Sequence, residues 1–446
     1  MPFPITAQNP IEHAATLPNS ADAVIIGGGI IGVMTAFELA KAGLKPVLLE
    51  KGRIAGEQSS RNWGWVRAQG RDPAEIPIML EAQAIWQKLD AQIEGLGVTQ
   101  AGSFYLATCE DDMAEYQGWL DHAAPFDMSS HLVSAHALAD HIPSAKARWA
   151  GALHTPSDMR AEPWCAVPAL ARAAVSMGAI IIEGCAVRAL DIEGGKITGV
   201  VTEKGRIKST NIALAGGAWS SLLLRRHGVN LPQLSVKASV AATETLPDIC
   251  KGNALDDRLS WRRRADGGYT LAPTDFHELF IGPDAFRAFG KYLPQLMQDF
   301  STTRYLPAAP KDFPDAWGTK RRWNADEITP FERMRVLNPT PHKAKIEKLA
   351  RDFADTFPEL GPVRLKASWA GMIDVMPDVV PVVDHCAALG NLTICTGMSG
   401  HGFGIGPAFG RITAKLMQGL DPVHDLTRFR MSRFSDGSKL DLGPSL

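Results

Sequence analysis

The segment from residue 23 to residue 49 constrains the fold more than any other part of the chain. Residues 23–26 form a short β-branched apolar run, which leads into the run GGGIIG at residues 27–32, a match to the G-x-G-x-x-G pattern. Residues 33–42 predict a helix that Gly43 ends, and residues 46–49 predict a second buried strand. A strand, a glycine-rich turn, a helix and another strand are typical of the Rossmann-like βαβ unit. The sequence therefore predicts an α/β protein with a dinucleotide-binding domain.

Each glycine of this turn has a distinct task in holding a nucleotide. Gly27 permits the tight turn, Gly29 lets the backbone approach a pyrophosphate, and Gly32 lets helix and strand pack closely. The helix N-terminus offers free N–H groups and a positive dipole end to the phosphates. Glu50 lies where an acid accepts hydrogen bonds from the adenosine ribose, and its charge would repel a 2′-phosphate, so FAD and NAD remain. The residues predicted to bind the cofactor here are Gly27, Gly29, Ile30, Ile31, Gly32, Glu50 and Lys51.

The composition excludes several other classes of protein. The 446 residues include 46 Lys and Arg against 48 Asp and Glu, so the basic excess of a nucleic-acid-binding protein is missing. The six cysteines form no CxxC pair and the 12 histidines form no HxxxH or HExxH motif, so we expect no bound metal. No apolar run is long enough for a transmembrane helix, and residues 1–20 lack the basic start of a signal peptide. We expect a cytoplasmic protein whose oligomeric state the sequence leaves open.

Three further motifs favour FAD over NAD. Residues 58–65 are rich in small and hydrogen-bonding side chains, and residues 212–220 predict a strand that ends in a glycine pair. Residues 392–396 predict a strand that runs into the glycine-rich segment 397–407 and then a helix. This second turn again aims backbone N–H groups and a helix N-terminus at an electron-rich group. The N1–C2=O2 edge of a flavin becomes anionic on reduction, so a helix dipole there favours the reduced flavin.

With these motifs the chain resembles the D-amino acid oxidase/sarcosine oxidase/glycine oxidase superfamily of FAD-dependent oxidoreductases. The matching segments are residues 24–32 with Glu50, 59–64, 215–220, 369–378 and 397–407, and the resemblance covers residues 21–419. It implies bound FAD, an amino acid or amine substrate, hydride transfer from the carbon bearing nitrogen to flavin N5, and hydrolysis of the imine. O2 is one electron acceptor. One alternative is a dehydrogenase or opine-oxidase-type subunit that passes electrons to a quinone or a protein partner, and another is a non-catalytic flavin-binding scaffold.

The resemblance also assigns cofactor contacts residue by residue. In relatives the position of Val187 gives backbone contacts to adenine, and the segment that begins at Gly400 lies at the pyrimidine end of the flavin. The implied loop along the flavin comprises Gln58, Ser59, Ser60, Asn62, Trp63, Gly64 and Trp65. The other implied contacts are Val187, Ala215, Gly216, Trp219, Gly371, Met372, Gly400, His401, Gly402, Phe403 and Gly404.

Two positions depart from the family pattern. Ile373 stands where relatives that bind α-amino acids carry an arginine that pairs with the substrate carboxylate, and Asp374 beside it reverses the local charge. We therefore expect poor turnover of glycine and sarcosine, and better turnover of a larger amine or amino acid. The carboxylate of such a substrate, where it has one, would meet Arg67 or Arg71, whose alternative role is in surface ion pairs. Asp374, if it points inward, would favour a substrate with a cationic or polar far end. Some relatives bind FAD covalently through a cysteine near the position of Gly371. Glycine cannot form this bond, so we expect noncovalent FAD.

Three side chains are candidates for a part in catalysis, each with a structural role as the alternative. His401 is the titratable group nearest to the flavin by motif, Lys237 on a predicted strand could face the flavin, and Tyr269 could cap the pocket. Trp65 is expected to form a wall of the substrate cavity. The arginines at residues 262–264 alternate along a strand and predict a solvated edge.

The family plan predicts two discontinuous domains. Residues 21–95, 150–235 and 366–420 would form the FAD-binding domain, and residues 96–149 and 236–365 a mixed α+β substrate domain. Residues 1–20 are an N-terminal extension, and residues 421–446 a polar tail that closes back onto the surface. Strands are predicted at residues 179–183, 186–191, 197–202, 207–214, 235–243, 259–264 and 268–271, and a helix at residues 342–357.

Overall fold

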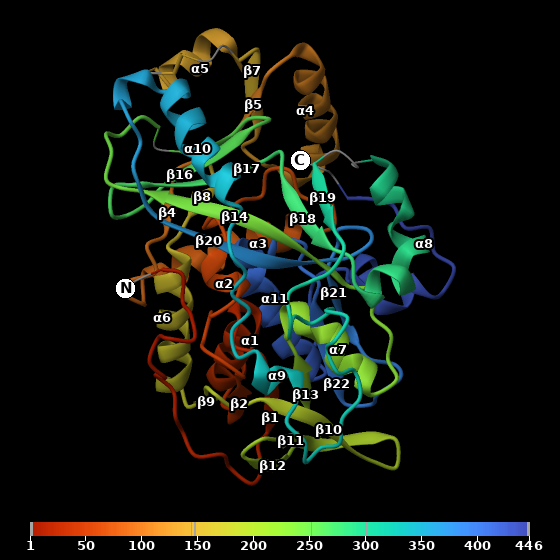
Figure 1. Cartoon of the computed structure of the whole chain (residues 1–446). Helices are drawn as coiled ribbons and strands as arrows, with labels where there is room; N and C mark the ends of the chain where they lie inside the picture. Colours follow the sequence, from red (N-terminus) through yellow and green to blue (C-terminus); the bar gives the residue numbers. More distant parts are fainter. Residues whose placement is uncertain (1–2, 144, 147–148, 251, 299–301, 444–446) are drawn as a thin grey trace.

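A parallel sheet built from distant parts of the chain forms the lower half of the molecule (Figure 1). The computed structural model describes residues 3–143, 145–146, 149–250, 252–298 and 302–443. The sheet has the strand order β21-β22-β13-β1-β2-β9, in which only the edge strand β21 runs antiparallel to its neighbour. Its strands are β1 (Ala23–Ile26), β2 (Pro46–Leu49), β9 (Ile180–Ile182), β13 (Ile212–Leu214), β21 (Val382–His385) and β22 (Leu392–Thr396). The predicted Rossmann-like α/β fold is therefore confirmed.

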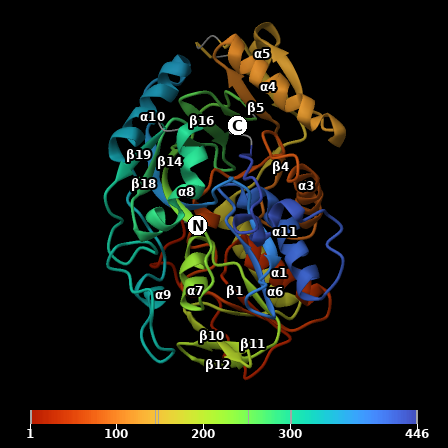
Figure 2. The same ribbon diagram turned by 90° about the vertical axis from the view of Figure 1, so that its right-hand side faces the viewer.

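The central strands bury alternate side chains on opposite faces of this sheet. Ile25 and Leu48 join the core beneath four helices, whereas Val24 and Val47 join the core beneath a three-stranded antiparallel sheet. The helices, which Figure 2 shows grouped together, are α1 (Ile30–Lys41), α3 (Ile76–Asp90), α6 (Pro163–Ser176) and α11 (Gly402–Met417). The small sheet contains β10 (Val187–Glu193), β11 (Lys196–Thr202) and β12 (Gly205–Lys208).

A ten-stranded mixed sheet forms the upper half of Figure 1. Its order is β19-β18-β14-β17-β16-β15-β5-β7-β6, and β20 pairs with β14 beside this path. The strands are β5 (Ser103–Ala107), β6 (His131–Ser134), β7 (Gly151–Thr155), β14 (Leu234–Thr243), β15 (Asn253–Leu255), β16 (Leu259–Arg263), β17 (Tyr269–Pro273), β18 (His277–Phe280), β19 (Thr303–Leu306) and β20 (Leu365–Val375). Its helices are α4 (Glu110–Ala123), α5 (Ala135–His141), α8 (Pro283–Gln298) and α10 (Lys343–Thr356).

Short elements join the two halves. The strands β3 (Trp65–Val66), β8 (Met159–Arg160) and β4 (Thr99–Gln100) form a third antiparallel sheet in the order β3-β8-β4. The remaining helices are α2 (Gln58–Arg61), α7 (Ser220–Arg226) and α9 (Pro330–Arg333), together with short 3₁₀ turns at Gly217–Trp219, Thr427–Phe429 and Met431–Phe434 among others. In the described part of the chain, no helix is both long and apolar enough to cross a membrane.

The structure differs from the predicted elements at three places. The strand predicted at 207–214 is two strands, β12 and β13, because the Ser209 hydroxyl accepts a hydrogen bond from the Asn211 N–H and turns the chain between them. β7 and most of β20 fall in the stretches expected in the FAD-binding domain, yet both strands belong to the large sheet. The arginines at 262–264 do not form a solvated edge, since Arg262 and Arg264 are buried.

Both terminal segments pack onto the folded chain. Phe3 stacks on Trp164 with 4.4 Å between ring centroids. In the tail, Arg433 pairs with Asp378 through Nε and Oδ2 at 2.7 Å, and both side chains are buried. A buried ion pair therefore anchors the tail, which the sequence had indicated only as a polar segment.

Candidate active site

The turn between β1 and α1 leaves room for a phosphate group at the start of a helix. Gly27 has φ +113°, and a Cβ atom there would lie 2.3 Å from the Ala215 carbonyl oxygen. A Cβ at Gly32 would lie 1.9 Å from the Gly27 oxygen, so β1 and α1 pack closely as predicted. At Gly29, the N-cap of α1, a Cβ would meet only the Ser59 hydroxyl, at 3.2 Å. The backbone is thus open at the position predicted to approach a pyrophosphate.

Glu50 lies at the end of β2, next to this turn. Its carboxylate accepts hydrogen bonds from the N–H of Gly28 at 2.7 Å and of Gly52 at 2.6 Å. Burial raises the pKa of Glu50 to about 7, although the charge of Lys51 opposes the rise. Lys51 itself pairs with Glu57 and lies 4.4 Å from the centroid of the Trp219 ring. The two groups therefore frame the nucleotide end of the site with opposite charges.

A second helix N-terminus lies beside the first, because the first turns of α11 pack against those of α1. α11 begins at Gly402 directly after the turn at residues 397–401, and no side chain caps its first N–H groups. Asp374 holds this turn, because its carboxylate accepts hydrogen bonds from the Gly397 N–H at 2.9 Å and from Gln233 Nε2 at 3.1 Å. Burial raises the pKa of Asp374 above its ordinary value. Its carboxylate is therefore engaged with the turn and is not available to a cationic end of the substrate, which corrects the charge expectation from the sequence.

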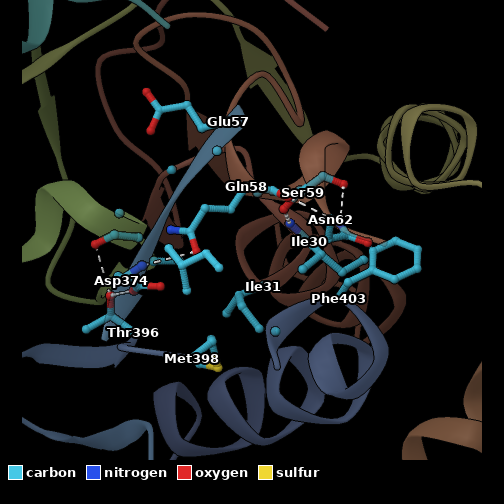
Figure 3. A pocket seen from close by; sticks show the side chains of 18 of the residues that line it. Ile30, Ile31, Glu57, Gln58, Ser59, Asn62, Asp374, Thr396, Met398 and Phe403 are labelled. Carbon is cyan, nitrogen blue, oxygen red and sulfur yellow. Dashed lines mark hydrogen bonds between the residues drawn. The ribbon is translucent and has the colours of Figure 1, made fainter. Parts of the chain in front are cut away.

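One cavity of about 360 Å³ connects the two helix N-termini (Figure 3). Figure 3 shows Ile30, Ile31, Ser59 and Asn62 on one side of it, and Asp374, Thr396 and Met398 on another. The predicted residues that line it are Gly27, Gly29, Ile30, Ile31, Glu50, Lys51, Gln58, Ser59, Asn62, Trp63, Trp65, Arg67, Arg71, Val187, Ala215, Gly216, Trp219, Gly371, Ile373, Asp374, Gly400, His401, Gly402, Phe403 and Gly404. These residues come from seven separate stretches of the chain.

The shape and donors of this cavity fit FAD. An elongated dinucleotide needs a phosphate site between two ends of different chemistry, and the open Gly29 backbone lies between Glu50 and the start of α11. The α11 N-terminus presents free N–H groups where a reduced flavin carries negative charge. A Cβ at Gly371 would lie 3.2 Å from Arg61 Cβ, so glycine leaves this wall clear.

Two arginines line the end of the cavity beyond Trp65. The Arg67 guanidinium carbon lies 5.9 Å from the Trp65 ring centroid and 5.3 Å from that of Tyr105. Arg71 is 3% exposed, its Nε donates to the Arg67 carbonyl, and its Nη1 has no hydrogen-bond partner. Burial, and next the charge of Arg67, lower the pKa of Arg71 to about 10. Arg67 Nη1 donates to the Gln69 carbonyl oxygen at 2.5 Å. Among the described residues neither guanidinium forms an ion pair with a carboxylate, so Arg71 Nη1 is left for a ligand and Arg67 keeps its charge available beside it.

His401 lies beside these arginines at the N-cap of α11. Its Nδ1 is 3.4 Å from Oε2 of Glu75, which is 1% exposed, but neither Nδ1 nor Glu75 Oε1 has a hydrogen-bond partner among the described residues. Burial, and next the charge of Arg71, lower the pKa of His401 to about 4. The imidazole is therefore neutral at physiological pH.

Strand alternation places two predicted residues outside the cavity. Lys237 on β14 is paired in register with Met372 on β20, whereas Ala238 and Gly371, the next pair, line the cavity. Lys237 instead forms an ion pair with Glu278, with Nζ and Oε2 2.6 Å apart. Neither Lys237 nor Met372 is among the residues that line the cavity, so the structure does not support the roles predicted for them.

Other predicted residues support the cavity from behind. Tyr269 lies in the core of the large sheet, where its hydroxyl accepts the Ile249 N–H at 3.0 Å, and it does not cap the pocket. The Ser60 hydroxyl accepts the Ile5 N–H, and Gly64 is backed by the guanidinium of Arg262. With Gly32, these are the remaining predicted residues that do not line the cavity.

The buried Arg262 positions the Trp63–Gly64 loop. Its Nε donates to the Trp63 carbonyl oxygen, and its Nη1 and Nη2 lie 2.9 and 3.3 Å from the two carboxylate oxygens of Glu162. A bidentate pair of this kind satisfies the hydrogen-bonding groups of both buried partners. The strand pattern alone gave no sign of a partner for this arginine.

Sequence reasoning missed several residues of the site. Strand alternation could have indicated Ala238 and Val240, because they face the same side of β14. Arg61 belongs to the α2 loop and donates to the Ala370 carbonyl at 2.9 Å beneath the cavity. Thr396 and Met398 lie in the predicted strand and glycine-rich turn at residues 392–407 but were not singled out, whereas no local pattern indicates Glu57, His277 and Phe331.

Comparison with protein families matches almost the whole chain. The model of the DAO family, described as FAD dependent oxidoreductase, matches residues 22–416. Glycine oxidase from Pseudomonas aeruginosa is 26% identical over 416 residues, which cover 90% of this chain and 96% of that protein. Human mitochondrial sarcosine dehydrogenase is 27% identical over 304 residues, which are 65% of this chain and 32% of that protein. The match therefore spans about a third of that longer relative.

Comparison with solved structures extends the likeness to the whole fold. The L-amino acid deaminase from Proteus myxofaciens, determined in complex with anthranilate, superimposes with a TM-score of 0.90 and 29% sequence identity. The alignment covers 96% of each chain. The L-amino acid deaminase from Proteus vulgaris is similar, with a TM-score of 0.89 and 28% identity.

Proposed function

Since this chain belongs to the DAO family of FAD-dependent oxidoreductases, enzymes that act on amino acids or amines, we propose that its substrate is an amino acid whose carboxylate binds Arg67 and Arg71. Bound FAD supplies the hydride acceptor for oxidation of the C–N bond to an imine, which water then hydrolyses. We further expect the enzyme to work in the cytoplasm. Its expected electron acceptor is O2, a quinone or a protein, and peroxide formation distinguishes the first of these.

Two arginines that form no ion pair with a carboxylate of the described residues carry this proposal. A buried guanidinium without an acceptor is costly, and the carboxylate of a ligand would supply the missing hydrogen bonds in bidentate geometry. Arg71 is buried with a free Nη1, and Arg67 stands on the Trp65 ring at the same end of the cavity. This pair offers a replacement for the arginine that the family pattern places at Ile373.

The walls of the same end favour a side chain larger than hydrogen. Trp63 and Trp65 meet edge to face with 5.7 Å between ring centroids, and Ile373 and Met398 add apolar surface to the lining. Glycine and sarcosine would leave these surfaces uncovered. A larger apolar or aromatic side chain would bury them and gain affinity from the hydrophobic effect.

Anaerobic reduction of the flavin tests the proposal directly. We expect the purified protein to hold FAD that acid precipitation releases intact, and at least one member of a panel of L- and D-amino acids to bleach it. Anthranilate should perturb the flavin spectrum of the wild type. Arg71→Leu should weaken anthranilate binding by at least about 30-fold, because it removes one partner of a buried charge pair.

Two controls separate carboxylate recognition from general damage. Arg263→Leu removes an arginine that donates to the Leu246 and Pro247 carbonyls outside the cavity, so it should leave anthranilate binding unchanged. Phenethylamine, which lacks a carboxylate, should bind wild type and Arg71→Leu equally. Unchanged anthranilate affinity in Arg71→Leu would contradict the arginine site, and a protein whose flavin no amino acid or amine reduces would contradict the function itself.

A further inference from the structure

Glu75 is a buried carboxylate directly behind the cavity wall with no task in the function described so far. It is the N-cap of α3, 1% exposed, and one of its oxygens has no hydrogen-bond partner. The other oxygen faces Nδ1 of His401 at 3.4 Å. Because Nδ1 is the buried nitrogen of a ring that lines the cavity, Nε2 is the nitrogen left for a ligand.

We propose that His401 takes the proton from the ammonium group of the substrate and that Glu75 orients and stabilises the resulting imidazolium. This inference rests on the proposed function, since it needs an amino acid held by Arg67 and Arg71. His401 would be the catalytic residue because it touches the substrate, and Glu75 a positioning residue that acts through it. A carboxylate behind a histidine base is a recurring arrangement in enzymes.

The step is a proton transfer without oxidation. One N–H bond of the substrate ammonium breaks, its electron pair stays on the substrate nitrogen, and the proton goes to His401 Nε2. As charge develops on the ring, Glu75 would accept a hydrogen bond from Nδ1–H across the present 3.4 Å separation, which keeps Nε2 free for the substrate proton. The neutral amine can then lose hydride from the adjacent carbon, because its lone pair stabilises the developing iminium.

The charges around His401 make the base dependent on bound substrate. Arg71 and Arg67 face it from the segment after β3 and lower its pKa, whereas Glu75 from the start of α3 raises it. Burial opposes ionisation of Glu75, but His401 and the arginines hold its pKa below the ordinary value, so it stays charged. A substrate carboxylate bound to Arg67 and Arg71 would offset the repulsion between these arginines and a protonated His401. The charge of Glu75 would then act to raise the pKa of His401. His401 would therefore be neutral when the site is empty and more basic when it is filled.

Two other titratable groups lie behind the arginines. Tyr105 is buried with a free hydroxyl, and burial raises its pKa. Burial also raises the pKa of Asp158 to about 6, and its carboxylate accepts the Ala68 N–H at 2.7 Å. Glu75 is the carboxylate that lies next to His401 and has the largest effect of any carboxylate on its pKa.

Proton uptake on binding of benzoate tests the inference without turnover. Benzoate supplies a carboxylate but no ammonium, so it should raise the pKa of His401 and draw a proton from mildly acidic buffer. Calorimetry in buffers of different ionisation enthalpy measures this uptake. We expect uptake in the holoprotein of the wild type and its loss in Glu75→Gln and in His401→Gln.

The rate of flavin reduction supplies a second readout. With L-phenylalanine under anaerobic conditions, Glu75→Gln should slow reduction at neutral pH by about 100-fold. The rate should recover toward alkaline pH, where free substrate has already lost its proton. Glu75→Asp, which keeps the charge, should retain part of the rate at neutral pH.

α3 offers a matched control for these variants. Glu81 on the same helix also contacts a histidine, His424, but outside the cavity, so Glu81→Gln should behave like the wild type. Unchanged proton uptake and an unchanged pH profile in Glu75→Gln would overturn the inference while the arginine site stands. Failure of wild type to bind benzoate would instead reject the arginine site on which it depends.

Discussion

Glu50 has to meet opposite demands in the empty and the filled cavity. As an anion it can accept hydrogen bonds from ribose hydroxyls, yet burial raises its pKa to about 7 in the protein alone. The N–H groups of Gly28 and Gly52 offset only part of this cost. Glu50, which is predicted to bind the cofactor, therefore lowers the stability of the folded protein when its carboxylate is charged and FAD is absent.

The stability of the apoprotein should fall as the pH rises through about 7. Glu50 keeps its proton in the folded state while the unfolded chain, with an ordinary pKa of 4.5, has lost it. The folded state thus binds more protons between these values, and the free energy of unfolding falls by about 1–3 kcal/mol across them. Urea unfolding of the apoprotein at several pH values measures the slope.

Two variants isolate the contribution of this residue. Glu50→Gln stays neutral and should flatten the slope, whereas Glu12→Gln removes a carboxylate that is 44% exposed and should not. FAD should also flatten the slope if the ribose satisfies the carboxylate. A slope that is the same in Glu50→Gln and the wild type would assign the pH dependence to other groups.

Single residues of the site were predictable where a local motif contains them. Gly27, Gly29 and Glu50 follow from the spacing of one βαβ unit, and all three line the cavity. Glu75 carries no such signal, because its partner His401 is far away in the sequence and meets it only through the packing of α3 on α11. The burial of Arg262 was unpredictable for the same reason, since Glu162 lies on another element.

At the scale of elements, β20 connects the large sheet to the flavin site. It pairs along the length of β14, and its alternation places Gly371 and Ile373 on the cavity side. Its end is fixed by Asp374, which holds the turn before α11. A change on the cavity side of β20 should therefore act on the substrate directly.

Ile373→Arg should shift selectivity toward small amino acids. The new guanidinium would offer a carboxylate partner inside the cavity and would also fill space that a large side chain needs. We expect the KM for glycine to fall by about 10-fold or more, as one charge-assisted hydrogen bond allows, and the KM for bulky substrates to rise. Steady-state kinetics with glycine, sarcosine and L-phenylalanine measure both effects.

Ile373→Met is the control, because it changes shape without adding charge and should leave glycine a poor substrate. Unaltered selectivity in Ile373→Arg would mean that this position does not reach the substrate. Efficient oxidation of glycine by the wild type would mean that its carboxylate is bound well without an arginine at 373.

Helices and strands were predictable where apolar residues recur with the regular spacing of a helix or a strand. The helix predicted at 342–357 is α10 at Lys343–Thr356, and the strand predicted at 235–243 is β14 at Leu234–Thr243. The partner of a strand was not predictable, because β14 and β20 meet across more than a hundred intervening residues. That pairing decides which side of each strand faces the cavity, and this is why Lys237 and Met372 were misplaced.

At the scale of the whole molecule, the two sheets should unfold together. β20 belongs to the large sheet yet lines the cavity of the nucleotide-binding half, and Arg262 ties β16 to the Trp63 loop. We expect a single calorimetric transition for the FAD-bound protein, with coincident loss of circular dichroism and release of flavin. Excess FAD should raise the midpoint of both probes by mass action.

The apoprotein is the reference for this experiment, since its lower midpoint gives the contribution of the cofactor. Two separated transitions in the FAD-bound protein, one with flavin release and one without, would show that the halves unfold independently.

The strand order of the lower sheet also governs events on the ribosome. β1 and β2 leave the exit tunnel early, but their neighbour β13 comes much later, and β22 and α11 later still. At about 5–20 residues per second, translation from residue 50 to residue 404 takes roughly 20–70 s. Throughout that interval the glycine turn lacks α11, which packs beside α1, and therefore lacks the part of the cavity wall that α11 supplies. FAD can therefore enter only after translation has passed α11, and the nascent half must escape aggregation for that time without it.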